Sequence, residues 1–105
     1  MASDTFRVGK RAEKNLSKIL DYYTDIDEKL ANRFFQEIDK CFEYIKDYPY
    51  MFTKRYREIR VCFTKVFSYG IYYVIKVTPK RKTTTITVIN ILHTSRKVRY
   101  KEKQS

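Results

Sequence analysis

The chain has 105 residues, a length that predicts a single domain covering residues 1–105. Hydrophobic residues make up 43% of it, with only two glycines and two prolines, which excludes a disordered protein and allows one core. The net charge is +11, and the excess lies in residues 54–105, which hold 14 Lys and Arg against two Asp and Glu. Positive charge concentrated in one half of the chain predicts an anionic partner, either nucleic acid or an acidic protein.

No apolar run is long enough to span a membrane, and no signal peptide is visible, so we expect a cytoplasmic protein without a membrane partner. Cys41 and Cys62 fit no metal-binding spacing, and each lies in an apolar pattern. We therefore expect two buried, reduced thiols in preference to a disulfide, which a cytosolic chain disfavours, and neither a metal site nor a cofactor.

The first half of the chain predicts a short strand and two helices. Phe6 and Val8 alternate with polar residues, as in a strand. Helices are expected over residues 10–24 and 27–47, the second ending before Pro49. The apolar positions at helical spacing are Ala12, Leu16, Ile19, Leu20 and Tyr23, then Leu30, Ala31, Phe34, Phe35, Ile38, Cys41, Phe42 and Ile45.

The link between the two helices is short, which predicts an antiparallel helical hairpin. Asp25 and Glu28 stand three residues apart and resemble a capping box for the second helix. Residues 48–56 are expected to form a loop rich in aromatic residues.

The second half predicts three strands, within residues 59–63, 67–77 and 86–93, where β-branched and aromatic residues gather. Short links between them predict an antiparallel meander, and helices must cover one face because the sheet is strongly apolar.

Residues 86–93 are apolar on both sides, which predicts an inner strand. A two-residue period places Ile86, Val88 and Leu92 on one side, and Ile89 and Ile91 on the other. We expect Ile89 to be a core residue, as we do Phe34.

The inner strand ends at His93, the only histidine, and the basic residues Arg96, Lys97 and Arg99 follow, with Tyr100. A rigid strand that delivers such groups to a surface is typical of a functional site. Spacing alone favours the simpler interpretation, in which His93 caps the strand and the basic segment is solvated.

The order of elements, together with particular residues on it, resembles the RelE/ParE superfamily of bacterial toxins. The residues that carry the resemblance are Ala12, Leu16, Asp21-Tyr22-Tyr23, Phe34, Ile38, Tyr48-Pro49, Ile59-Arg60, the segment from Tyr69 to Tyr73 and the segment from Ile91 to Arg96. The ending Ile-Leu-His-x-x-Arg is closer to the ParE and plasmid-stabilisation branch. The resemblance implies an α+β fold of order β-α-α-β-β-β, with a helical hairpin packed on a twisted antiparallel sheet.

The resemblance also implies the toxin component of a bacterial type II toxin–antitoxin system, a growth inhibitor neutralised by a cognate antitoxin. ParE-type members poison DNA gyrase without catalysis of their own, whereas RelE-type members cut mRNA on the ribosome. We expect ParE-like action, because Gly70 stands where ribonuclease members often carry an arginine. The alternatives are a RelE-like mRNA endonuclease and, outside the family, a non-catalytic basic nucleic-acid-binding domain.

Site residues follow from the same resemblance. If the chain is a ribonuclease, His93, Arg96 and Tyr100 would be catalytic, as proton donor, phosphate clamp and base-stacking or acid/base group. If it binds gyrase, Lys97 and Arg99 would join Arg96 in a contact surface. Further positive charge at the target would come from Arg60 and Lys65. Whether the protein is an enzyme thus depends on its target, and no small-molecule cofactor is implied in either case.

Overall fold

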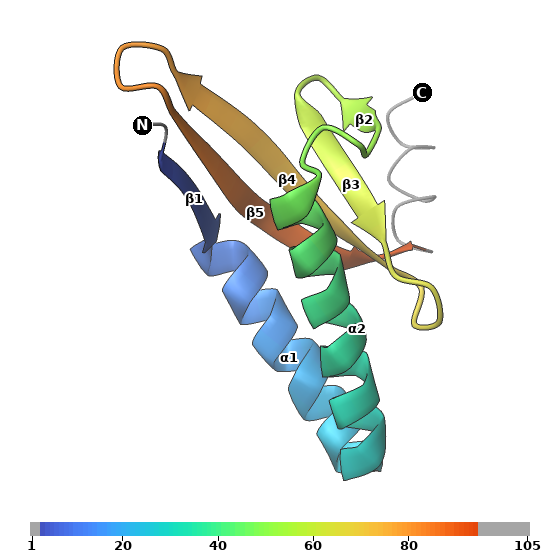
Figure 1. Ribbon diagram of the computed structural model, residues 1–105. Helices are drawn as coiled ribbons and strands as arrows, with labels where there is room; N and C mark the ends of the chain where they lie inside the picture. The colour runs from blue at the N-terminus through green and yellow to red at the C-terminus, as the bar shows by residue number, and fades with distance from the viewer. Residues whose placement is uncertain (1–2, 95–105) are drawn as a thin grey trace.

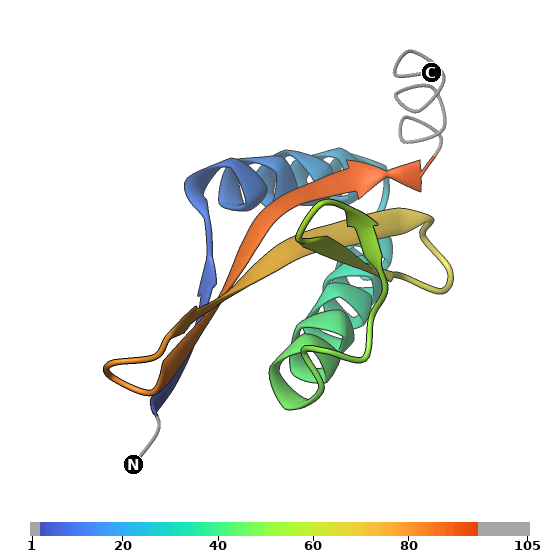
Figure 2. The same cartoon turned by 90° about the horizontal axis from the view of Figure 1, so that it is seen from above.

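The computed structural model describes residues 3–94, in which two helices pack on a five-stranded sheet (Figures 1 and 2). The elements are β1 (Ser3–Val8), α1 (Lys10–Ile26), α2 (Glu28–Asp47), β2 (Lys54–Tyr56), β3 (Ile59–Phe63), β4 (Tyr69–Thr78) and β5 (Thr83–His93). The strand order is β1-β5-β4-β3-β2. The expected α+β fold, its helical hairpin and the inner position of the last strand are therefore confirmed.

The sheet is mixed, which corrects the expectation of a wholly antiparallel one. Strand β1 pairs in parallel with β5, from Ser3 opposite Thr83 to Val8 opposite Val88, and every other pair is antiparallel. Helix α1 continues in the direction of β1 and α2 returns, so that β3 can run in the direction of β1 (Figure 1). Two further reversals give β5 that same direction. The short strand β2 also lies where a loop was expected.

The second helix begins at a different cap from the one predicted. The carboxylate of Asp27 accepts a hydrogen bond from the backbone N–H of Lys29 at 3.0 Å, which is the N-cap arrangement. Asp25 lies inside the last turn of α1, because that helix continues to Ile26. The predicted capping box of Asp25 and Glu28 is therefore wrong by two residues.

Strand β5 carries a β-bulge in its second half. Val88 pairs with Tyr73, but the next pair along the ladder joins Asn90 to Tyr72. Ile89 is the extra residue, with no partner on β4.

The bulge changes which residues of β5 face the helices. Ile86, Val88 and Ile91 are all buried in the core shared with the helices. Ile89 and Leu92 are only partly buried. One inserted residue reverses the alternation of faces in the rest of the strand. The expected strict two-residue period is therefore wrong, and so is the expectation that Ile89 is a core residue.

The core lies between the helical hairpin and the sheet, and Phe34 is at its centre, as predicted. Phe34 is fully buried and its ring lies 5.2 Å from that of Tyr23, 5.3 Å from that of Phe67 and 5.2 Å from that of Tyr69. The buried cluster comprises Ala12, Phe34, Ile38, Cys41, Ile45, Cys62, Tyr69, Ile71, Tyr73, Ile86, Val88 and Ile91. This cluster fixes the ends of β4 and β5 against α1 and α2.

Both cysteines are buried, as expected. Within residues 3–94, no helix is long and apolar enough to cross a membrane. In the same residues, no three His, Cys, Asp or Glu side chains are grouped so that they could hold a metal ion.

Candidate functional site

His93 ends β5 beside the first residue of β4. It pairs with Tyr69, and the two rings meet edge to face with their centroids 5.1 Å apart. The N–H of Thr94 donates to the carbonyl of Ser68 at 2.9 Å, which fixes the chain directly after the strand. His93 thus has a packing contact at the strand end, while its half-buried ring still borders a groove.

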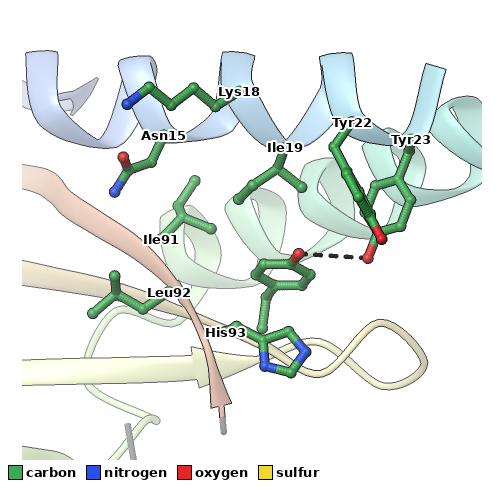
Figure 3. Close-up of a pocket in the computed structure, with 9 residues that line it drawn as sticks. Asn15, Lys18, Ile19, Tyr22, Tyr23, Ile91, Leu92 and His93 are labelled. Atoms are coloured by element: carbon green, nitrogen blue, oxygen red, sulfur yellow. Dashed lines mark hydrogen bonds between the residues drawn. The ribbon is translucent and has the colours of Figure 1, made fainter. Parts of the chain in front are cut away.

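This α1–β5 groove has a volume of about 520 Å³. It is lined by Asn15, Lys18, Ile19, Tyr22, Tyr23, Tyr69, Ile91, Leu92 and His93. Figure 3 shows the side chains of Ile19 and Tyr23 extending from α1 toward the end of β5, where His93 lies. The structure therefore brings the one histidine together with a lysine and three tyrosines that the sequence did not connect to it.

Helix α1 can line this groove because β1 ends early. Strand β1 stops at Val8, and the N–H of Gly9 makes a last hydrogen bond to the carbonyl of Val88 at 2.8 Å. A Cβ at position 9 would lie 3.1 Å from that carbonyl oxygen, so glycine permits the close approach. Beyond this point α1 replaces β1 beside β5, and Asn15 donates to the side-chain oxygen of Asn90.

The polar groups of the α1–β5 groove lie near the end of β5. The hydroxyl of Tyr23 donates to that of Tyr69 at 3.4 Å, and the ring of Tyr69 in turn packs edge to face on His93. Lys18 adds a cation at the rim. An arginine can clamp a phosphate through two parallel hydrogen bonds, whereas a lysine acts as a point charge; no arginine lines this groove within the described residues.

Gly70 lies beneath three side chains of β3 and β4. A Cβ built there would lie 3.0 Å from Val61 Cγ2, 3.1 Å from Tyr72 Cε1 and 3.3 Å from Phe63 Cε1. The guanidinium of Arg55 lies 5.5 Å from the centroid of the Phe63 ring above this position. Burial raises the pKa of Tyr72, although Arg55 acts in the opposite sense. A side chain at this position would therefore require its neighbours to shift by a few tenths of an ångström.

The other predicted contact residues are placed as follows. Arg60 donates to the carbonyl of Phe52 at 2.7 Å and stacks on Tyr50 with 5.3 Å to the ring centroid, so it fastens the loop before β2. Lys65 is exposed beside α2. The remaining predicted site residues lie outside the described part of the chain: Arg96, Lys97, Arg99 and Tyr100. Of the three predicted catalytic residues, the structure therefore places His93 alone.

A second groove, of about 610 Å³, lies between α2 and β3 and is mainly apolar. This α2–β3 groove is lined by Arg33, Gln36, Glu37, Lys40, Cys41, Tyr44, Met51, Phe52, Cys62, Phe63, Lys65, Val66 and Phe67. Met51 is 60% exposed and Val66 67% exposed, which is unusual for apolar side chains on one concave surface. Glu37 accepts hydrogen bonds from the N–H groups of Val66 at 2.7 Å and Phe67 at 3.3 Å, and thereby holds the β3–β4 loop against α2.

Sequence reasoning found neither groove. For the α1–β5 groove, the one signal in the sequence was that Lys18 and Tyr22 flank the apolar stripe of α1. For the α2–β3 groove the signal was Val66, an apolar residue in a polar turn between two strands.

Comparisons with known proteins agree with this fold. The model of the family "ParE toxin of type II toxin-antitoxin system, parDE" matches residues 6–98. A solved structure titled "Chromosomal ParDE TA system from P. aeruginosa" is similar, with a TM-score of 0.69 and 14% sequence identity, covering 85% of this chain and 94% of the other. At this identity the structural likeness concerns the fold alone. No curated protein sequence matches the chain.

Proposed function

Because this chain belongs to the ParE family of type II toxin–antitoxin toxins, we propose that it inhibits DNA gyrase in the cytoplasm and does not cut RNA. The observation that carries the choice of target is Gly70, which has no side chain where an arginine would stabilise the phosphate. A Cβ at this position would lie 3.0 Å from Val61 and 3.1 Å from Tyr72, so both side chains would have to shift by a few tenths of an ångström to admit one. Loss of one such charge-stabilising donor typically lowers an enzymatic rate by about 10²–10³.

The charge distribution supports a macromolecular target. Residues 54–105 carry 14 Lys and Arg, and gyrase works on DNA, a polyanion. In this proposal His93 has a structural role at the end of β5, where it packs on Tyr69. The basic residues Arg96, Lys97 and Arg99 then contribute a contact surface.

Two assays on the same purified protein test the target. One measures supercoiling of relaxed plasmid by purified gyrase, and the other maps cleavage of ribosome-bound mRNA. We expect inhibited supercoiling and intact mRNA. Codon-positioned cleavage that disappears in His93→Ala and Arg96→Ala would overturn the proposal, and so would the absence of both activities. Lys82→Ala, at the exposed tip of the β4–β5 hairpin, serves as the matched control.

The family implies a cognate antitoxin, and we propose that one of its segments docks in the α2–β3 groove. The apolar walls of the groove suit the apolar face of such a segment. Arg33, Lys40 and Lys65 stand among the lining residues, so acidic groups on the segment would speed its capture.

Co-purification with the product of the neighbouring gene tests this docking site. Val66→Asp places a charge on the groove and should weaken capture of the antitoxin. Val77→Asp is the control, since Val77 is 53% exposed on β4, outside the residues that line the groove. Equal losses in the two variants would contradict this site, and a chain that is harmless alone and captures no neighbour would contradict the antitoxin proposal itself.

A further inference from the structure

The two cysteines meet at the α2–β3 groove, although 20 residues separate them in sequence. Cys41 lies on α2 and Cys62 on β3, and both belong to the buried core cluster. The Sγ of Cys41 lies 3.9 Å from the carbonyl oxygen of Phe63, the residue that follows Cys62. Both residues also border the groove.

The two thiols are chemically unequal. A side-chain hydrogen bond between them, followed by burial, raises the pKa of Cys41. The same hydrogen bond lowers the pKa of Cys62, against the effect of burial. Cys62 is therefore the one that more readily forms the nucleophilic thiolate, while Cys41 keeps its proton.

We infer that Cys41 and Cys62 form an oxidation site, at which a hydroperoxide converts the pair into an intramolecular disulfide joining α2 to β3. A metal-binding role is less suited to the pair, since no third His, Cys, Asp or Glu is grouped with it in the described residues. The inference concerns this chain alone and does not depend on its target.

The chemistry proceeds in two balanced steps with hydrogen peroxide as the oxidant. The Cys62 thiolate attacks one peroxide oxygen, an S–O bond forms, the O–O bond breaks, and the hydroxide released takes up a proton to become water. The Cys41 sulfur then attacks the sulfenic sulfur of Cys62. An S–S bond forms, the S–O bond breaks, and the hydroxyl leaves as water with the thiol proton. Two thiols lose two electrons, and one peroxide becomes two waters.

The disulfide would change the α2–β3 groove. Disulfide formation requires the two Cα atoms to come within about 7 Å, so the bond would set the distance between α2 and β3 at this point. Oxidation would therefore link covalently the two elements that border the groove.

Peroxide treatment of the full-length reduced chain tests the inference. We expect a monomer lighter by two hydrogen atoms, and a peptide map in which the Cys41 and Cys62 peptides are joined. In Cys41→Ser, Cys62 should stop at the sulfenic acid and be trapped by dimedone. In Cys62→Ser, Cys41 should remain a thiol at the same peroxide dose.

A second measurement does not depend on whether the variants fold. In a glutathione redox buffer, the equilibrium constant for the disulfide should be more than about tenfold larger in the native wild-type chain than in urea, because the unfolded chain must pay the entropy of loop closure to bring the thiols together. Equal equilibrium constants in the two conditions, disulfide-linked dimers, or two free thiols at a peroxide dose that oxidises glutathione would each overturn the inference.

Discussion

Replacing Phe34 with alanine removes the aromatic ring around which both helices and the sheet meet. A buried Phe→Ala change costs about 3–5 kcal/mol of unfolding free energy, through lost burial and the cavity that remains. Phe34 is fully buried and contacts the rings of Tyr23, Phe67 and Tyr69. Each such aromatic pair contributes about 0.5–1.5 kcal/mol beyond burial. The expected loss of unfolding free energy therefore lies near the upper end of the range of about 3–5 kcal/mol.

The neighbouring residue supplies the control, with the same side chain on the same helix. Phe35 is 49% exposed, so Phe35→Ala should cost less than about 1 kcal/mol. Urea unfolding of both variants, followed by circular dichroism, measures the two losses. A loss below about 1 kcal/mol for Phe34→Ala, or equal losses for the two variants, would refute the placement of the core.

Three further predictions concern the bulge, the helix cap and a buried phenol. Ile91→Ala should cost about 2–5 kcal/mol and Ile89→Ala clearly less, because only Ile91 is in the core; urea unfolding of both distinguishes them. Asp27→Ala should cost about 1 kcal/mol through loss of the cap on α2, whereas Asp25→Ala should be close to neutral in the same assay. Burial raises the pKa of Tyr73 from 10 to about 12. The folded state therefore keeps a proton that the unfolded chain releases, so stability should fall as pH rises from 10 to 12. Tyr73→Phe should reduce this fall in thermal melts across the same pH interval.

The helices could be predicted closely because their signal is local. The apolar spacing around Phe34 and Ile38 depends only on the 3.6-residue turn, and both residues are fully buried. Which residues of β5 face the helices could not be predicted, since the bulge at Ile89 depends on how β5 pairs with β4. The position of the cap at Asp27 was missed for a related reason, because the packing of α1 decides where that helix ends.

In the candidate site, too, the local features could be predicted from the sequence and the long-range contacts could not. That Gly70 lacks a side chain was evident from the sequence, but its cover by Val61 and Tyr72 follows from the register across β3 and β4. Lys18 and His93 are 75 residues apart and share a groove only because α1 lies beside the end of β5. Local patterns carry no information about such long-range neighbours.

The parallel pairing of β1 with β5 has a consequence for synthesis of the chain. Ser3 pairs with Thr83, so the first strand made must wait for 80 more residues before its partner exists. Helices α1 and α2 contact each other and can form as soon as they leave the ribosome, but the sheet cannot be completed until β5 emerges. A nascent chain therefore presents neither the α1–β5 groove nor the His93 end of the sheet. The sheet of this toxin is therefore completed only when translation of the chain is nearly finished.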